Sequence, residues 1–114
     1  MAKHSPALDD TFRALADPTR RAVVQALTRG PASVSALAEP FDMALPSFVQ
    51  HIRQLEACGL ITSRKEGRVR TCALNAARLG EAERWMAEQR RLWEAQADRL
   101  GGFLKTKMQK KKDA

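Results

Sequence analysis

The spacing of the apolar residues changes once along this chain, and the change limits the folds that it can adopt. In the first half of the chain, apolar residues recur every three or four positions, as on the buried face of a helix. Leu60–Lys65 and Arg68–Leu74 then have the composition of strands and are separated by a turn at Glu66–Gly67. The helical spacing returns after Asn75 and continues to Leu104. The sequence therefore predicts helices, one hairpin and a long final helix.

Capping and helix-ending residues divide the first half of the chain into four helices. Asp17–Pro18 closes the first helix and caps the second, which Gly30 ends. A short third helix begins near Ser33, and a fourth spans Leu45–Cys58 before Gly59 stops it. Two consecutive short helices followed by a hairpin are typical of a winged helix-turn-helix. We therefore predict a mainly α winged helix-turn-helix with a two-stranded wing and a long C-terminal helix.

The positive charge of the chain is concentrated in two segments. The net charge is +7. Residues 43–74 contain five Lys or Arg and two Glu, and residues 105–114 contain five Lys and one Asp, whereas the other segments are balanced. A surface charged only for solubility would spread this excess. The concentration therefore favours a polyanionic partner such as nucleic acid.

The fourth helix carries side chains of the kinds that contact DNA. Arg and Gln can read base edges in a major groove, and polar side chains can bind the phosphates. The candidate DNA contacts on this helix are Pro46, Ser47, Gln50, His51, Arg53 and Gln54. The alternative is an ordinary solvated helix face, and His51 could instead hold the helix internally.

Basic residues flank the predicted turn of the hairpin. The tip of such a hairpin can reach an adjacent minor groove or the DNA backbone. Alternation along the strands indicates that Arg64, Lys65, Arg68 and Arg70 do not all face one way. We expect Lys65, Arg68 and Arg70 to contact DNA, with Lys65 and Arg68 foremost. The alternative is a charged edge that prevents aggregation between strands.

The cysteine count and the hydropathy favour a cytoplasmic protein. Two cysteines, Cys58 and Cys72, are too few for a disulfide framework. The sequence has no apolar stretch long enough to span a membrane and no recognisable secretory signal. We expect both cysteines to be small buried core residues. The alternative is a thiol pair that senses oxidants, which requires the two sulfurs to lie close together.

Three motifs resemble those of ArsR/SmtB-type bacterial repressors. They are Leu15-Ala16-Asp17-Pro18-Thr19-Arg20-Arg21, His51-Ile52-Arg53-Gln54-Leu55 followed by Gly59-Leu60-Ile61, and the wing tip Arg64-Lys65-Glu66-Gly67-Arg68. They occur in the family's order, and the similarity extends over about residues 8–104. This resemblance implies a homodimer built from the first and last helices. It also implies binding to a partly palindromic operator near its own promoter, with release on a signal.

The resemblance does not extend to the familiar metal sites of metal-sensing members. Ser33-Val34-Ser35 stands where these members often carry Cys-Val-Cys, and serine hydroxyls are poor ligands for soft metals. Other members bind zinc through His and Asp or Glu on the last helix, but residues 76–104 contain no His and no Cys. We therefore expect no metal and no cofactor, and the inducer stays open.

Apolar residues of the first and last helices are the expected dimer contacts that the resemblance implies. They are Leu8, Phe12, Leu15, Met86, Trp93 and Leu100. Residues 1–104 would then form one DNA-binding and dimerisation domain. Residues 105–114 are predicted to be a basic, disordered tail.

The sequence contains no recognisable catalytic constellation, so an enzyme is not expected. It has no Gly-rich phosphate loop and no nucleophile with a suitable base. The predicted function is a sequence-specific double-stranded DNA-binding transcriptional regulator, a homodimeric repressor of its own or a neighbouring operon, with no membrane partner. One alternative is a winged-helix protein-interaction module, which the apolar Leu45 and Val49 on the fourth helix would favour. Another is the same regulator switched by cysteine oxidation.

Overall fold

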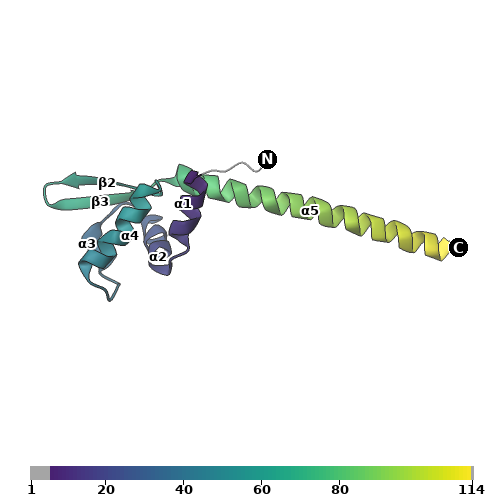
Figure 1. The fold of residues 1–114 in the computed structure, drawn as a ribbon, viewed down its shortest axis with the longest axis horizontal. Coiled ribbons are helices and arrows are strands. Elements are labelled where there is room, and N and C mark those ends of the chain that lie inside the picture. Colours follow the sequence, from purple (N-terminus) through teal and green to yellow (C-terminus); the bar gives the residue numbers. More distant parts are fainter. Residues whose placement is uncertain (1–5, 114) are drawn as a thin grey trace. The chain divides into compact units, whose positions relative to one another are not determined.

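The helices and strands follow the order that the sequence predicts. The computed structural model describes residues 6–113, and the side chains of residues 6–108. The elements are α1 (Pro6–Leu15), α2 (Pro18–Leu27), β1 (Ala32–Ser33), α3 (Val34–Ala38), α4 (Leu45–Ala57), β2 (Ile61–Glu66), β3 (Val69–Leu74) and α5 (Ala76–Asp113) (Figure 1). This order confirms the mainly α winged helix-turn-helix, in which α3 and α4 form the helix-turn-helix and β2 and β3 form the wing.

Side-chain caps set the starts of α2 and α3. Asp17 has an extended backbone at the N-cap of α2, and its carboxylate accepts a hydrogen bond from the amide of Arg20 at 3.0 Å. The hydroxyl of Ser33 accepts from the amide of Ala36 at 3.1 Å and starts α3 in the same way. Each cap satisfies a backbone donor that has no partner within its own helix.

Gly59 ends α4 and turns the chain into the wing. Its φ of +81° lies in the left-handed region, which favours glycine. The amides of Gly59 and Leu60 donate to the carbonyls of Glu56 and Leu55, each at 3.0 Å, so the end of the helix is closed by two hydrogen bonds. Leu55 and Leu60 are fully buried beside this turn. The closed turn determines the direction in which the chain leaves α4 towards β2.

The wing belongs to a three-stranded sheet, whereas the sequence predicted two strands. β3 pairs antiparallel with both neighbours, which gives the strand order β1-β3-β2. Ala32 of β1 lies opposite Cys72 of β3. Because β1 has only two residues, it is too short to produce a detectable alternation in the sequence.

The turn of the wing hairpin lies one residue later than predicted. Glu66 pairs with Val69, so the turn consists of Gly67–Arg68 and not of Glu66–Gly67. Gly67 has a φ of +61°, which suits the two-residue hairpin turn that takes glycine at its first position. Arg68 is therefore a turn residue at the tip of the wing and not the first residue of a strand.

One apolar core joins the helices and the wing in the unit that ends at Ala82. Its buried residues are Ala14, Val23, Val24, Leu27, Leu37, Phe48, Ile52, Leu55, Cys58, Leu60, Ile61 and Cys72. The rings of Phe41 and Phe48 pack with their centroids 5.4 Å apart. Because α4 buries Phe48, Ile52 and Leu55 against the other elements, its opposite face is directed to solvent.

The chain divides into two compact units within α5, between Ala82 and Glu83. In the second unit, apolar side chains are about half exposed or more; they are Trp85, Met86, Leu92, Trp93, Leu100, Phe103, Leu104 and Met108. The helix extends to Asp113 where the sequence predicted a disordered tail. Lys and Gln are good helix formers, and Gly101–Gly102 weakens the helix without ending it. Within residues 6–113, the helices lack an apolar stretch of the length needed to span a bilayer.

Candidate DNA interface

The polar residues predicted to contact DNA lie mainly on the exposed face of α4. Successive residues of a helix are rotated by about 100°, so positions 46, 47, 50, 53 and 54 fall on one side. This face, opposite the buried Phe48 and Leu55, consists of Pro46, Ser47, Gln50, Arg53 and Gln54, all of them exposed. Of the six candidates on this helix, only His51 lies away from this face.

Lys65 and Arg70 lie directly opposite each other in the wing, on β2 and β3. Their face of the hairpin also carries the buried Ile61 and Cys72, because side chains alternate along each strand. Arg64 points to the other face. The structure therefore separates Arg64 from the two wing residues on the strands that were expected to contact DNA.

Arg68, Arg53 and Lys65 are candidate DNA contacts whose positive charges are not paired within the described residues. Arg68 is exposed at the wing tip and Arg53 on α4, and neither has a hydrogen-bond or ion-pair partner within residues 6–108. Arg70 is different, because its Nη1 atom donates to the hydroxyl of Ser63 at 2.9 Å and lies 3.9 Å from the carboxylate of Glu56.

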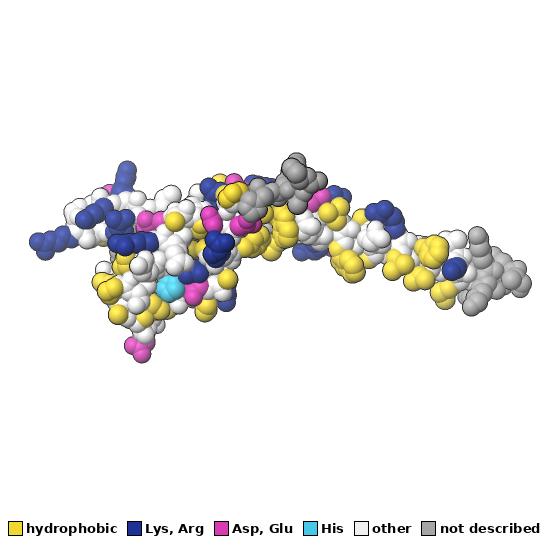
Figure 2. Space-filling model, in the orientation of Figure 1, with side chains coloured by type: hydrophobic (Ala, Val, Ile, Leu, Met, Phe, Trp, Pro, Cys, Tyr) yellow, Lys and Arg dark blue, Asp and Glu magenta, His cyan; other side chains and the backbone are white. Residues whose placement is uncertain are grey.

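Like charges gather on the wing. Two cations placed opposite each other on neighbouring strands repel, as Lys65 and Arg70 do. Figure 2 shows further Lys and Arg side chains clustered over the end of the β2–β3 hairpin. Because a bound polyanion would relieve this repulsion, the arrangement suits contact with a phosphate backbone.

Arg20 links three helices and was not among the predicted site residues. Its side chain is buried, with 9% of the residue exposed. Its guanidinium donates to the carbonyl of Ala14 at 2.7 Å, to the carbonyl of Arg13 at 3.2 Å and to Nδ1 of His51 at 3.1 Å. The two carbonyls lie in the last turn of α1, beyond the regular i+4 ladder, where they also accept long hydrogen bonds from the amides of Ala16 at 3.3 Å and Asp17 at 3.5 Å. With Asp17, whose Oδ2 atom is 3.6 Å from Nδ1 of His51, these side chains form the Arg20 cluster.

His51 is a member of this cluster and supports α4 from inside. A guanidinium has only donors, so Nδ1 of His51 is the acceptor in its contact with Arg20. The sequence left two roles open for His51, and the geometry favours internal support over DNA contact. Arg20 and Asp17 were present in the Leu15–Arg21 motif, so the motif contained the signal, but it did not indicate which element they would join.

Asp17 contributes stability that depends on pH. The hydrogen bond from the Arg20 amide lowers the pKa of Asp17 below its usual 3.8, and the charge of Arg20 acts in the same direction against the opposing effect of desolvation. The unfolded chain therefore binds this proton more tightly than the folded chain does. The stabilisation is fully present above pH 3.8 and is lost as the pH falls through the lowered folded pKa.

We expect Asp17→Ala to lower the free energy of unfolding by about 1 kcal/mol at neutral pH, since it removes an N-cap. Asp17→Asn keeps a neutral cap. The difference in unfolding free energy between wild type and Asp17→Asn should therefore shrink as the pH falls below 3.8, the usual pKa of an aspartate. Urea unfolding at a series of pH values measures both effects. A difference that is constant with pH would contradict this role of Asp17.

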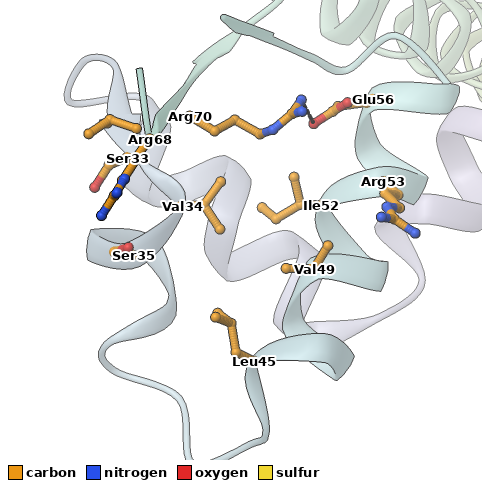
Figure 3. Close-up of a pocket in the computed structure, with 11 residues that line it drawn as sticks. Ser33, Val34, Ser35, Leu45, Val49, Ile52, Arg53, Glu56, Arg68 and Arg70 are labelled. Carbon is orange, nitrogen blue, oxygen red and sulfur yellow. Dashed lines mark ion pairs between the residues drawn. The ribbon is translucent and has the colours of Figure 1, made fainter. Parts of the chain in front are cut away.

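A groove with a volume of about 590 Å³ lies between α3, α4 and the wing (Figure 3). Its apolar wall comes from three elements and includes Val34, Leu45, Val49 and Val69. Figure 3 shows Leu45 and Val49 directed towards Val34. The two apolar residues of α4 therefore line the groove and do not interrupt the polar face of the helix.

Comparisons with known proteins agree with the helix-turn-helix and its exposed polar face on α4. A helix-turn-helix domain family matches residues 15–64. A crystal structure of an ArsR family transcriptional regulator is 57% identical to this chain, with a TM-score of 0.77, and the match covers 82% of this chain and 97% of that one. The chain belongs to the ArsR family. It is a DNA-binding transcriptional regulator, as the sequence predicted.

Two further relatives of this ArsR-family regulator are more distant. The transcriptional repressor SdpR of Bacillus subtilis is 29% identical over 79 residues, which are 69% of this chain and 88% of the relative. A solution structure from Mycobacterium bovis, of a homodimeric winged helix-turn-helix DNA-binding domain, is 22% identical with a TM-score of 0.57. That match covers 82% of this chain and 91% of the other, and at this identity it supports the fold alone.

The predicted dimer contacts of the ArsR-family regulator fall in both units. Leu8, Phe12 and Leu15 are half-buried on α1. Met86, Trp93 and Leu100 are 51%, 69% and 57% exposed on α5. Leu15 packs against the core of the first unit, whereas Met86, Trp93 and Leu100 are each more than half exposed.

The serines at the position of a metal-binding motif have other roles in this regulator. Ser33 caps α3, and Ser35 is exposed at the edge of the groove. Among the described residues, no group of three or more His, Cys, Asp or Glu could hold a metal ion.

Both cysteines are buried thiols in the core. Cys58 donates a hydrogen bond to the carbonyl of Leu55 at 3.4 Å, and neither cysteine is in a disulfide. Burial raises the pKa of the Cys72 thiol, with the charge of Glu56 adding to the effect and that of Arg70 opposing it. A raised pKa lowers the fraction of thiolate, which is the reactive form. These environments favour core packing over the thiol switch.

Proposed function

We propose that this ArsR-family regulator is a cytoplasmic homodimeric repressor of its own or a neighbouring operon. The exposed face of α4 enters the major groove of a partly palindromic operator, and the wing tip contacts the adjacent minor groove or backbone. Two half-sites lie about one helical turn apart, ~10 bp. The protein acts by binding and release and not by catalysis.

The observation that carries this proposal is that the polar face of α4 and the basic tip of the wing border the same groove. Gln50, Arg53 and Gln54 share the exposed face of α4, and Arg68 lies at the tip of the neighbouring wing. Glutamine and arginine suit base edges and phosphates, and the unpaired guanidiniums suit the DNA backbone. His51 is assigned to support α4 through Arg20 and not to contact bases.

A dimer is proposed because the second unit exposes an apolar helix face. Trp93 and Leu100 are more than half exposed on α5 and recur at a spacing of seven residues, which keeps them on one side of the helix. The Mycobacterium bovis domain of the same fold is a homodimer. A second copy of the chain would cover this face.

We expect Trp93→Asp to shift the protein from dimer to monomer, because it places a charge in the proposed interface. Sedimentation velocity measures the change. Arg84→Asp is the matched control, since position 84 lies on the opposite side of the helix and is exposed. A wild-type protein that sediments as a monomer would contradict the proposed dimer.

The experiment that tests the function is selection of duplexes from a random DNA pool by the purified protein at ~150 mM salt, where nonspecific binding is weak. The expected result is an enriched palindrome with half-sites one turn apart, which Gln50→Ala binds with relaxed base preference. If the pool shows only salt-sensitive binding to every duplex, the sequence-specific regulator is contradicted, and a protein-interaction module becomes the better explanation.

A further inference from the structure

We propose that the groove between α3, α4 and the wing binds a small organic anion, a carboxylate with an apolar body, and that this ligand competes with DNA. The competition rests on the proposed function, whereas the binding does not. The apolar body would lie against Val34, Val49 and Val69, and the carboxylate against Arg68.

The size and composition of the groove fit such a ligand. Its volume of about 590 Å³ lies within the usual range of sites for small molecules, which are largely apolar and contain a few polar groups. Leu45 and Val69 are 55% and 52% exposed at its edge. An apolar ligand would remove these side chains from water, which DNA phosphates cannot do.

The position of the charges places the carboxylate at one end of the groove. Arg68 lines the groove together with Ser33 and Ser35, and Figure 3 shows all three in the same part of the view. Arg68 has no partner among the described residues, whereas Arg70 is occupied by Ser63 and Glu56. The hydroxyl of Ser33 accepts from an amide and can still donate its own proton. A guanidinium with nearby hydroxyl donors is a suitable environment for a carboxylate.

The same groove would couple the ligand to DNA binding. Arg68 and Arg53 line it and also belong to the proposed DNA interface. A carboxylate on Arg68 neutralises the charge at the wing tip, and an apolar body between α4 and the wing occupies space that faces the DNA. The ligand and the operator therefore exclude each other, and such a ligand would act as an inducer.

Methyl resonances of valine provide a direct test with decanoate as the probe. Val34, Val49 and Val69 line the groove, whereas Val23 and Val24 are buried in α2 and serve as internal controls. We expect decanoate to shift the first three resonances and not the other two. Decylamine, which has the same chain with the opposite charge, should bind at least tenfold more weakly.

Substitutions test the basic end and the apolar wall of the groove separately. Arg68→Ala should weaken decanoate binding at least tenfold, and the matched wing variant Arg64→Ala should leave it unchanged, since Arg64 lies outside the groove. Leu45→Asp should also weaken binding. This carboxylate in the first turn of α4 is compatible with the helix, so the variant is expected to fold.

Failure of the groove site can be distinguished from failure of the proposed DNA-binding function. Shifts confined to the control residues Val23 and Val24, or no shifts while the operator still binds, would overturn the groove site and leave the DNA-binding function intact. Groove shifts without loss of operator binding would keep the site and overturn the competition. Groove shifts together with release of a labelled operator by decanoate would support both.

Discussion

Replacing Arg20 with alanine is expected to lower the free energy of unfolding by about 3 kcal/mol, because it removes three charge-assisted hydrogen bonds from a buried position. The carbonyls of Ala14 and Arg13 at the end of α1 lose a strong donor, and Nδ1 of His51 loses its partner. Urea unfolding measures the loss, and the slope of the unfolding free energy against urea concentration should stay unchanged. Operator affinity should fall as well, because Arg20 supports α4 through its hydrogen bond to His51.

Two variants isolate the geometry of Arg20 from its charge. Arg20→Lys keeps the charge but cannot serve three acceptors in a planar fork, so it should recover little of the stability. Arg21→Ala is the control: Arg21 is exposed and donates to the single carbonyl of Leu15 at 2.7 Å. We expect it to cost less than about 1 kcal/mol. Equal losses of unfolding free energy for Arg20→Ala and Arg21→Ala would contradict a stabilising role of the Arg20 cluster.

The double variant Arg53→Ala/Arg68→Ala is expected to weaken operator binding by about a hundredfold or more at ~150 mM salt, with about tenfold from each change. The two guanidiniums lie on α4 and at the wing tip and share no partner within the described chain, so their effects should add. Each phosphate contact that is lost should also lower the slope of log affinity against log salt by about one. Fluorescence anisotropy over a range of salt concentrations measures both quantities.

Arg29→Ala is the matched control for these variants. Arg29 is exposed in the loop after α2 and belongs to neither α4 nor the wing. It removes the same charge from the protein, so any general electrostatic effect should appear in both experiments. If Arg29→Ala weakens binding as much as Arg68→Ala does, the affinity depends on net charge and not on this interface.

Local signals were sufficient for most of the fold. Asp17 and Ser33 cap their helices where the sequence predicted helix starts, because a side-chain cap involves residues only three positions apart. The apolar stripe of α4 correctly placed Phe48, Ile52 and Leu55 inside, but its fourth member, Leu45, is 55% exposed. The polar candidates of this helix are exposed except for His51. The two-residue strand β1 was missed because it depends on pairing with β3, which lies far along the chain.

The sequence by itself determined the order of the helices, the hairpin, the concentration of positive charge and the residues on the outer face of α4. These features depend on periodicity, composition and contacts between near neighbours. The tertiary structure decided that His51 joins Arg20, which is 31 positions away, and that Leu45 and Val49 face a groove shared with the wing. Such contacts form only when separate elements pack together, and no local pattern specifies which buried donor will meet which acceptor.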